Sequence, residues 1–317
     1  MIYIILGVIS FLIITIFIIS YICFRMAFFT TRKDDAKGLT LPHSDLYGPY
    51  RETVKNWMEE TKGTEKETVS IISFDGLKLY GKYYECIPGA PIELMMHGYR
   101  GRAERDLSGG VQRCFKLGRN ALIIDQRACG KSEGNVITFG INEYRDCLSW
   151  IDFIIKHFGE DTKIILCGIS MGASTVLIAS QQNLPKNVVG VLADCGYTSA
   201  KAIIKKTVKE MKLPPNISYP FVKLGGLLFG HFNIDEVSSI NAVKNATIPI
   251  IFIHGEEDDF VPCSMSKENF EACTSEKELL IVKGAAHGLS YPAAPDEYLK
   301  TVANFFDKNG LPTTVIK

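Results

Sequence analysis

The sequence lacks any imbalance of charge. Lysine and arginine together number 35, aspartate and glutamate also number 35, and the formal net charge is zero. Binding of nucleic acid favours a basic surface, so the composition gives no reason to expect a nucleic-acid partner. Internal repeats and low-complexity tracts are also lacking, and 46% of the residues are hydrophobic, as in an ordinary globular protein.

Paired cysteines are lacking as well. The nine cysteines are an odd number, and no two of them have the C-x-x-C spacing. Several lie inside apolar runs, so we expect buried free thiols, with neither a disulfide framework nor a zinc site. Free thiols favour a reducing compartment.

Charge is absent from one long segment, residues 2–24, which reads IYIILGVISFLIITIFIISYICF. A helix of this length spans roughly 35 Å, enough to cross a bilayer core of about 30 Å. A cleaved signal peptide would need a basic region before the apolar core and a small-residue cleavage site, and neither is evident. We expect residues 1–25 to form a transmembrane anchor, with a signal peptide and a buried core helix as the alternatives.

Basic residues follow this segment and none precedes it. They are Arg25, Arg32, Lys33 and Lys37. The positive-inside rule then predicts that the C-terminal domain lies in the cytoplasm, in agreement with the cysteine content.

The rest of the chain divides into a connection and one larger domain. Residues 26–68 are predicted to be a juxtamembrane connection with a short helix over 50–62. From residue 69 to 317, strand-like and helix-like segments alternate. A hairpin is expected over 69–85, with Asp75 and Gly76 at its turn.

Short apolar runs after the hairpin have the length of strands. They cover 92–98, 120–127, 163–168, 187–196, 248–255 and 277–284, and helical patterns lie at 144–158, 171–182, 265–274 and 296–308. This alternation predicts an α/β fold with a mostly parallel central sheet flanked by helices. The chemistry of such sheets lies at the carboxyl ends of the strands.

One segment, at about 196–247, interrupts the alternation. It is helical and punctuated by proline, with an apolar patch at 221–232. We expect a helical cap over the site that lines an apolar acyl pocket. The alternative is a scaffold helix with loops.

Ser170 lies in the pattern G-x-S-x-G, between Gly168 and Gly172, after one strand-like run and before a helix. This is the setting of a nucleophile elbow, in which glycine on both sides permits a sharp turn that exposes the serine. A serine hydroxyl becomes a good nucleophile only when a base takes its proton. His287 follows the last strand and precedes the last helix, so it is the predicted base.

The base needs a carboxylate to orient it. Four acidic residues, Glu256 to Asp259, follow the penultimate apolar run, and Asp194 is a rival at the end of another. The tetrahedral intermediate also needs two N–H donors. We predict the amides of Met171 and of Tyr99, which lies in the loop "HGYRG" at 97–101. His97 is expected to be structural.

Five motifs in this order, HGYRG, DQRACGKSEG, GISMG, HGEEDDFVP and GAAHGLS, resemble those of the α/β-hydrolase superfamily. The group that looks most similar is the bacterial membrane-anchored branch related to serine aminopeptidases and prolyl oligopeptidases. The resemblance covers about residues 69–308. It lays Asp258 on the family's acid position, with Asp259 as the alternative. Ala128 and Cys129 depart from the family's glycine-containing loop.

The resemblance implies a serine hydrolase with Ser170, Asp258 and His287 that cleaves carboxylic esters, or thioesters, through an acyl-enzyme. A lipophilic acyl substrate and a membrane are the expected partners, and no metal or organic cofactor is expected. A serine peptidase or amidase with the same three residues is the first alternative. A catalytically silent, membrane-tethered binding module is the second.

Overall fold

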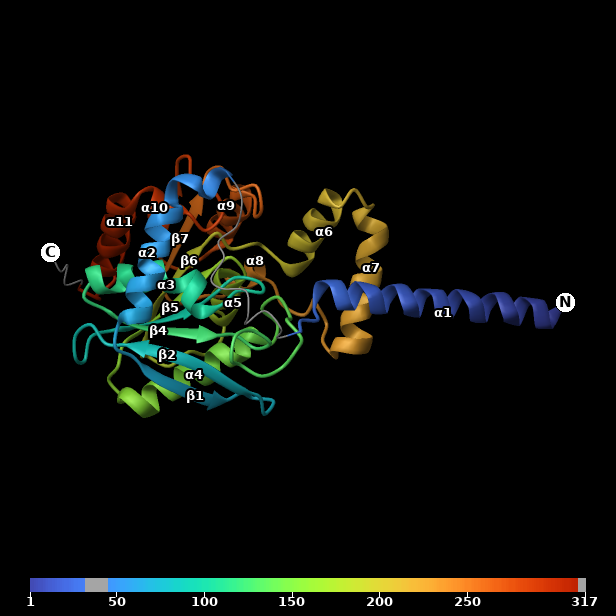
Figure 1. The fold of residues 1–317 in the computed structure, drawn as a ribbon, viewed down its shortest axis with the longest axis horizontal. Helices are drawn as coiled ribbons and strands as arrows, with labels where there is room; N and C mark the ends of the chain where they lie inside the picture. The colour runs from blue at the N-terminus through green and yellow to red at the C-terminus, as the bar shows by residue number, and fades with distance from the viewer. Residues whose placement is uncertain (32–44, 313–317) are drawn as a thin grey trace.

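A computed structural model describes residues 1–31 and 45–312 of the chain, and its centre is a twisted sheet of eight strands (Figure 1). The strand order is β1-β2-β4-β3-β5-β6-β7-β8. The bounds are β1 Glu67–Ile72, β2 Lys78–Tyr84, β3 Ile92–Met96, β4 Asn120–Asp125, β5 Ile164–Ile169, β6 Val188–Asp194, β7 Ile250–Gly255 and β8 Lys277–Val282.

The sheet is parallel from β4 to β8, and β2 pairs antiparallel with both β1 and β4. Strands β3 and β7 are buried at every position, as expected for strands covered on both faces. Edge strand β1 is partly exposed. The hairpin prediction is confirmed, with Gly76 at a φ of 89° in the turn. The predicted α/β-hydrolase architecture is likewise confirmed.

Helices cover both faces of the sheet. The bounds are α1 Ile2–Ala27, η2 Asp45–Tyr50, α2 Arg51–Gly63, α3 Ala103–Lys116, α4 Glu143–Phe158, α5 Met171–Ala179, α6 Ala200–Glu210, α7 Pro215–Gly225, η3 Gly226–Gly230, α8 Ser239–Ala242, α9 Cys263–Ala272, α10 Ser290–Ala293 and α11 Pro295–Lys308. One apolar cluster lies beneath α4 and α5, and a second lies beneath α3 and α11. We call the sheet, together with every helix above except α1, α6, α7 and η3, the sheet domain.

Helix α3 is absent from the sequence prediction. Gly109 and Gly110 lie in its interior, where glycine weakens a helix. Tertiary packing explains them. A Cβ atom on Gly110 would lie 2.6 Å from the sulfur of Met95 in β3, and one on Gly109 would lie 2.9 Å from the Trp57 ring in α2. The two glycines therefore allow α3 to pack closely against its neighbours.

Helix α1 is the one helix among the described residues that is long and apolar enough to cross a membrane. Most of it extends away from the sheet domain, but its C-terminal end is docked on it (Figure 1). Phe24 and Phe28 are buried there, the Ile137 N–H donates to the Phe28 carbonyl, and Phe29 forms a β-bridge with Val136.

The insertion at 196–247 contains α6, α7, η3 and α8. Helices α6 and α7 project from the sheet domain, and α7 crosses α1 close to its domain-side end (Figure 1). We call α1, α6, α7 and η3 together the arm. A third apolar cluster joins the arm to the sheet domain. Residues 32–44 of the predicted juxtamembrane connection, including Arg32, Lys33 and Lys37, and residues 313–317 of the predicted domain lie outside the described residues.

Candidate active site

Ser170 lies on a sharp turn between β5 and α5. Its φ of 56° and ψ of −117° form a sparsely populated conformation for a residue with a side chain. A Cβ atom on Gly168 would lie 2.2 Å from the backbone of Gly172, and one on Gly172 would lie 2.0 Å from the Met96 carbonyl oxygen. Both glycines are therefore required by close backbone approach.

The structure brings Ser170, His287 and Asp258 into one hydrogen-bonded chain. The His287 Nε2 lies 2.9 Å from the Ser170 hydroxyl oxygen, and its Nδ1 lies 2.7 Å from Asp258 Oδ2. An ionised carboxylate can only accept, so Nδ1 carries the proton and Nε2 is free to accept the serine proton. This is the geometry of a nucleophile, a base and an orienting acid.

Several donors converge on the Asp258 carboxylate. Its Oδ1 accepts from the amides of Phe260 and Val261, at 2.9 and 2.8 Å. Burial would raise the pKa of this carboxyl, but the hydrogen bonds with His254 and His287 outweigh burial and hold the pKa well below its usual value. The carboxylate therefore stays ionised in mild acid.

His254 is a member of this site that sequence reasoning left without a role. Its Nε2 lies 3.1 Å from Asp258 Oδ2 and 2.8 Å from the Val261 carbonyl oxygen, while Nδ1 lies 2.7 Å from the Ser266 hydroxyl. With Nε2 as donor and Nδ1 as acceptor, a neutral His254 satisfies all three contacts. Its position at the end of β7, before Gly255, is the one sequence feature that indicates a place near the site.

The alternative acids do not reach His287. The Asp194 carboxylate accepts from the hydroxyls of Ser290 and Tyr298, at 3.0 and 3.1 Å, and burial raises its pKa. Asp259 is exposed, as are Glu256 and Glu257, whereas Asp258 is buried. Of the five carboxylates considered, Asp258 is the one that contacts the histidine.

The predicted oxyanion loop, residues 97–101, lies against the serine. A Cβ atom on Gly98 would lie 3.4 Å from Ser170 Cβ and 3.8 Å from its hydroxyl oxygen. Met171 begins α5 on the other side of the serine. His97 is buried, and its Nε2 accepts a hydrogen bond from the backbone N–H of Gln126 at 3.1 Å. This contact fits the structural role expected of His97.

The same loop is hydrogen-bonded to the end of α1. The Tyr99 hydroxyl donates to the Ala27 carbonyl at 2.8 Å. The Arg100 guanidinium donates to the carbonyls of Met26 and Phe29, at 3.0 and 3.1 Å. No local pattern predicts this contact, because it joins residues more than 70 positions apart.

A cavity of about 450 Å³ opens at Ser170. It is lined by Tyr47, Val54, Gly98, Tyr99, Arg105, Asp106, Ile169, Ser170, Phe260, His287, Gly288 and Leu289. None of these belongs to the insertion, so the prediction that the insertion lines the pocket is wrong. The insertion packs on α1 instead and reaches only the rim, where Lys206 donates to the Asp259 carbonyl.

The segment predicted to be a connection contributes to this cavity instead. Tyr47 in η2 and Val54 in α2 line it, and the Tyr47 hydroxyl donates to the His287 carbonyl at 2.5 Å. Burial and neighbouring acidic groups raise the pKa of Tyr47, so the phenol remains a donor. This contact tethers the loop that carries the histidine.

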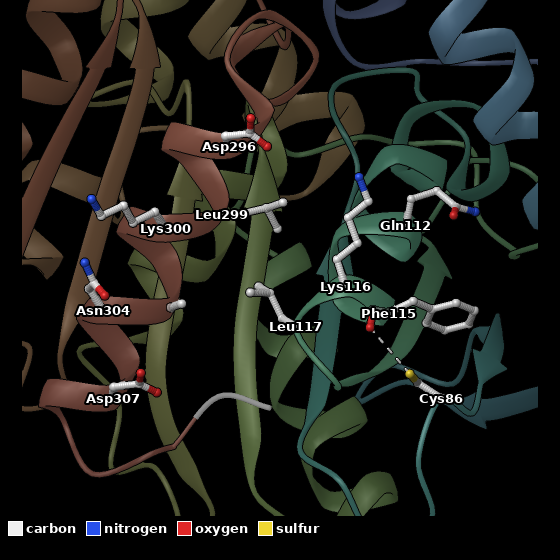
Figure 2. A pocket seen from close by; sticks show the side chains of 11 residues that line it. Cys86, Gln112, Phe115, Lys116, Leu117, Asp296, Leu299, Lys300, Asn304 and Asp307 are labelled. Atoms are coloured by element: carbon white, nitrogen blue, oxygen red, sulfur yellow. Dashed lines mark hydrogen bonds between the residues drawn. The ribbon is translucent and has the colours of Figure 1, made fainter. Parts of the chain in front are cut away.

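A larger hollow, of about 940 Å³, lies between α3 and α11, away from Ser170 (Figure 2). The Cys86 thiol donates to the Phe115 carbonyl at its edge, and Leu117 and Leu299 face each other across it. No nucleophile paired with a base lines it among the described residues. Size alone therefore points away from the chemistry, and we take the smaller cavity as the candidate site.

Potential metal ligands also converge at the site. Cys195, Asp258 and His287 each offer one ligand atom within 4.8 Å of the others. Burial raises the pKa of the Cys195 thiol well above its usual value, so the thiol stays protonated and is a poor ligand. The histidine and aspartate are already bonded to each other.

Comparison with known proteins identifies the family. Residues 138–310, more than half of the chain, match the model of the prolyl oligopeptidase family. The chain belongs to this family. The match contains Ser170, Asp258 and His287, and it agrees with the α/β-hydrolase resemblance drawn from the five motifs.

Individual relatives agree with the family. An uncharacterized protein, YqkD of Bacillus subtilis, is 29% identical over 196 residues, which are 60% of this chain and 63% of that protein. Protein bem46 of Schizosaccharomyces pombe is 24% identical over 272 residues, 82% of this chain and 81% of the relative. The aligned part is thus under two thirds of the Bacillus protein.

Among solved structures, the esterase Pf2001 of Pyrococcus furiosus is similar. It has a TM-score of 0.64 and 26% identity, and the match covers 80% of this chain and 94% of the esterase. This chain is therefore an α/β-hydrolase, and one of the solved structures that it resembles is an esterase.

Proposed function

We propose that the protein is a serine hydrolase that cleaves carboxylic esters through an acyl-enzyme on Ser170. The observation that carries the proposal is the chain of hydrogen bonds from Asp258 through His287 to Ser170, at 2.7 and 2.9 Å, beside a cavity that reaches the serine. In this proposal Ser170 is the nucleophile, His287 the base and Asp258 the orienting acid.

The reaction begins when Ser170 Oγ attacks the ester carbonyl carbon and its proton passes to His287 Nε2. The carbonyl oxygen becomes an oxyanion, which the amides of Tyr99 and Met171 stabilise as donors. His287 then gives its proton to the leaving alcohol as the carbon–oxygen bond breaks. Water attacks the acyl-enzyme by the same route, which releases the acid and restores the serine.

The cavity supports an acyl substrate. Val54, Ile169 and Leu289 provide apolar walls, and the Phe260 ring lies 5.0 Å from the His287 ring in an edge contact. Apolar walls favour a lipophilic acyl chain, because burying each methylene contributes about 0.8 kcal/mol. Thioesters form a second substrate class, since their cleavage uses the same steps.

A peptidase or amidase is the alternative function, and the membership of the prolyl oligopeptidase family favours it. The same three residues serve both reactions. Turnover of p-nitrophenyl esters against the corresponding aminoacyl-p-nitroanilides separates the two. Faster turnover of the anilides would favour the peptidase.

We also propose that α1 is an uncleaved membrane anchor and that the sheet domain lies on its cytoplasmic side. Phe24 and Phe28 fill the cluster that joins the arm to the sheet domain, so cleavage after the apolar segment would remove part of a packed core. Retention of α1 therefore preserves buried contacts. Glycosylation mapping and protease protection of the full chain in membranes test the orientation.

Labelling with a fluorophosphonate probe tests the nucleophile. We expect the wild type and a control, Ser180→Ala, to be labelled, and Ser170→Ala to be unlabelled. Ser180 is also buried at the end of α5, where it donates to the Leu177 carbonyl. Labelling that survives in Ser170→Ala contradicts the assignment.

A further inference from the structure

Helix α7 and η3 pack against one face of the C-terminal part of α1. A Cβ atom on Gly225 would lie 2.4 Å from the Ser20 carbonyl oxygen and 3.1 Å from Phe24 Cβ, so α7 and α1 are in close backbone contact. The Phe229 ring in η3 lies 4.9 Å from the Phe17 ring and 5.1 Å from the Tyr21 ring. These contacts fix the insertion to the apolar segment itself.

The position of these contacts along α1 sets a depth. Arg25 has the first charged side chain of the sequence, and Phe17 precedes it by eight residues, or roughly 12 Å of helix at 1.5 Å per residue. If α1 spans a bilayer, a ring packed on Phe17 lies below the level of Arg25, inside the apolar layer. Helix α7 crosses α1 near its domain-side end (Figure 1), so in such a bilayer it would run along the membrane surface.

Apolar side chains of α7 and η3 face outward at this level. Ile217 is 65% exposed, and Leu227 and Leu228 are each 43% exposed. Met211 and Leu213, in the link between α6 and α7, are each 48% exposed. Exposed apolar residues gathered beside an apolar helix mark a surface that has a partner.

The charge of this segment indicates which partner. Residues 200–230 contain six lysines and a single acidic residue, Glu210. Lys201, Lys209 and Lys212 are exposed, whereas Lys223 is paired with Asp235 at 2.7 Å. Lysine beside exposed apolar residues is the composition of helices that lie at the interface of an anionic membrane.

We propose that α6, α7 and η3 form a second membrane-binding element, which binds an anionic phospholipid bilayer. Leucine and isoleucine side chains enter the acyl layer beside α1, and the exposed lysines contact the phosphate headgroups. This proposal rests on the anchoring of α1 proposed above. It also brings the rim of the cavity to the membrane surface, because Lys206 of α6 contacts the Asp259 carbonyl and lies 5.5 Å from the Phe260 ring.

The depth of the arm is measured with tryptophan in the full chain, reconstituted in vesicles whose phospholipids have brominated acyl chains. Three variants are compared: Phe11→Trp in α1, Leu228→Trp in η3 and Ile72→Trp, an exposed position on edge strand β1. Native Trp57 and Trp150 lie in α2 and α4 of the sheet domain and give the baseline. We expect strong quenching of the first two variants and baseline quenching of Ile72→Trp.

Each outcome has a distinct meaning. Quenching of Phe11→Trp without quenching of Leu228→Trp overturns the second membrane element and leaves the anchor intact. Failure of both variants to be quenched overturns the anchor and the proposal together. A change in Leu228→Trp emission that depends on protein concentration, without quenching by bromine, indicates a second copy of the chain and also overturns the proposal.

The headgroup preference is measured in mixed vesicles of phosphatidylcholine with a minority of phosphatidylglycerol, with bromine on only one lipid at a time. We expect quenching of Leu228→Trp, per brominated lipid, to be several-fold stronger when phosphatidylglycerol carries the bromine. Adding Lys201→Gln, Lys209→Gln and Lys212→Gln should abolish this preference. Adding Lys186→Gln, Lys283→Gln and Lys300→Gln, which are exposed lysines outside the arm, should preserve it. Equal quenching by the two lipids in the wild-type lysine background overturns the anionic preference.

Discussion

The sheet domain and the arm use the same apolar residue types in opposite ways. In the sheet domain, isoleucine, leucine and valine of β3 to β7 are buried between helices. In the arm, such residues cover the outside of α1 and much of α7 and η3. A run of apolar residues alone therefore does not show whether its side chains are buried inside the protein or contact something else. In the arm, we propose that they contact lipid.

The two regions meet at the site. The third apolar cluster contains Phe24 of α1 and Phe28 just after it, Tyr219 and Val222 of α7, and Met171 next to the serine. The arm therefore shares an apolar cluster with the residue that follows Ser170, and it contacts the predicted oxyanion loop through the Tyr99–Ala27 hydrogen bond. Substitutions in each region can show how far the sheet domain works independently of the arm.

Asp258→Asn should lower kcat for ester hydrolysis by about 10⁴-fold, as expected when the histidine loses its orienting carboxylate and takes the wrong tautomer. Asp194→Asn is the matched control, since Asp194 is also a buried carboxylate but bonds Ser290 and Tyr298. It should change kcat far less. Equal losses in the two variants would remove the distinction between the two acids.

The same two variants should affect the pH dependence of stability with opposite signs. Asp258 has a lowered pKa in the folded chain, so its stabilising contribution is present above its usual pKa of 3.8 and is lost as pH falls through the folded value. Asp194 has a raised pKa, so wild type should lose stability relative to Asp194→Asn as pH rises above 3.8 through the folded value. Urea unfolding of the full chain in detergent, from pH 2 to pH 8, measures both differences, with the Asp258 difference expected below pH 3.8 and the Asp194 difference above it. Parallel curves would contradict the assignment.

Gly225→Val should separate α7 from α1 and reduce stability by about 1–3 kcal/mol, because the added atoms overlap the Ser20 carbonyl. Gly7→Val is the control, since no heavy atom lies within 4 Å of a Cβ atom there. Hydrogen exchange of the α7 amides should accelerate in the first variant alone. Unchanged exchange would show that the arm does not depend on this contact.

Much of the sheet domain is predictable from the sequence, because its information is local. Apolar runs of strand length, the Asp75-Gly76 turn and the glycines around Ser170 each reflect a requirement within a few residues. Helix α3 is the exception. Its glycines lower the local helical propensity, and their reason lies in contacts with Met95 and Trp57, far away in the sequence.

The candidate site divides in the same way. The positions of Ser170, His287 and an acid after β7 follow from the strand ends, but the choice of Asp258 among four acids needed the family resemblance. The contacts of Tyr47 with His287, and of Tyr99 with Ala27, join residues 240 and 72 positions apart. Periodicity contains no information about such pairs, so the arm's docking on the oxyanion loop was invisible before the structure.

Arg100→Ala should give the smallest effect and the sharpest test of the link between the two regions. Arg100 has a φ of 53°, and its guanidinium donates to two carbonyls at the C-terminal end of α1, where the helix dipole favours a cation. Loss of these bonds should loosen the loop that carries the Tyr99 amide without removing that donor. We therefore expect kcat to fall about tenfold, less than the 10²–10³-fold cost of deleting an oxyanion donor, with KM little changed.

Two further variants accompany this test, with p-nitrophenyl butyrate as the soluble substrate for the full chain. Arg100→Lys retains one donor and should recover part of kcat, and Lys116→Ala, which removes an exposed cation on α3, should behave as wild type. A rise in KM at constant kcat would mean that Arg100 binds substrate. No change in either constant would mean that α1 is docked on the loop but does not set its geometry, and that the sheet domain positions its oxyanion donors independently of the arm.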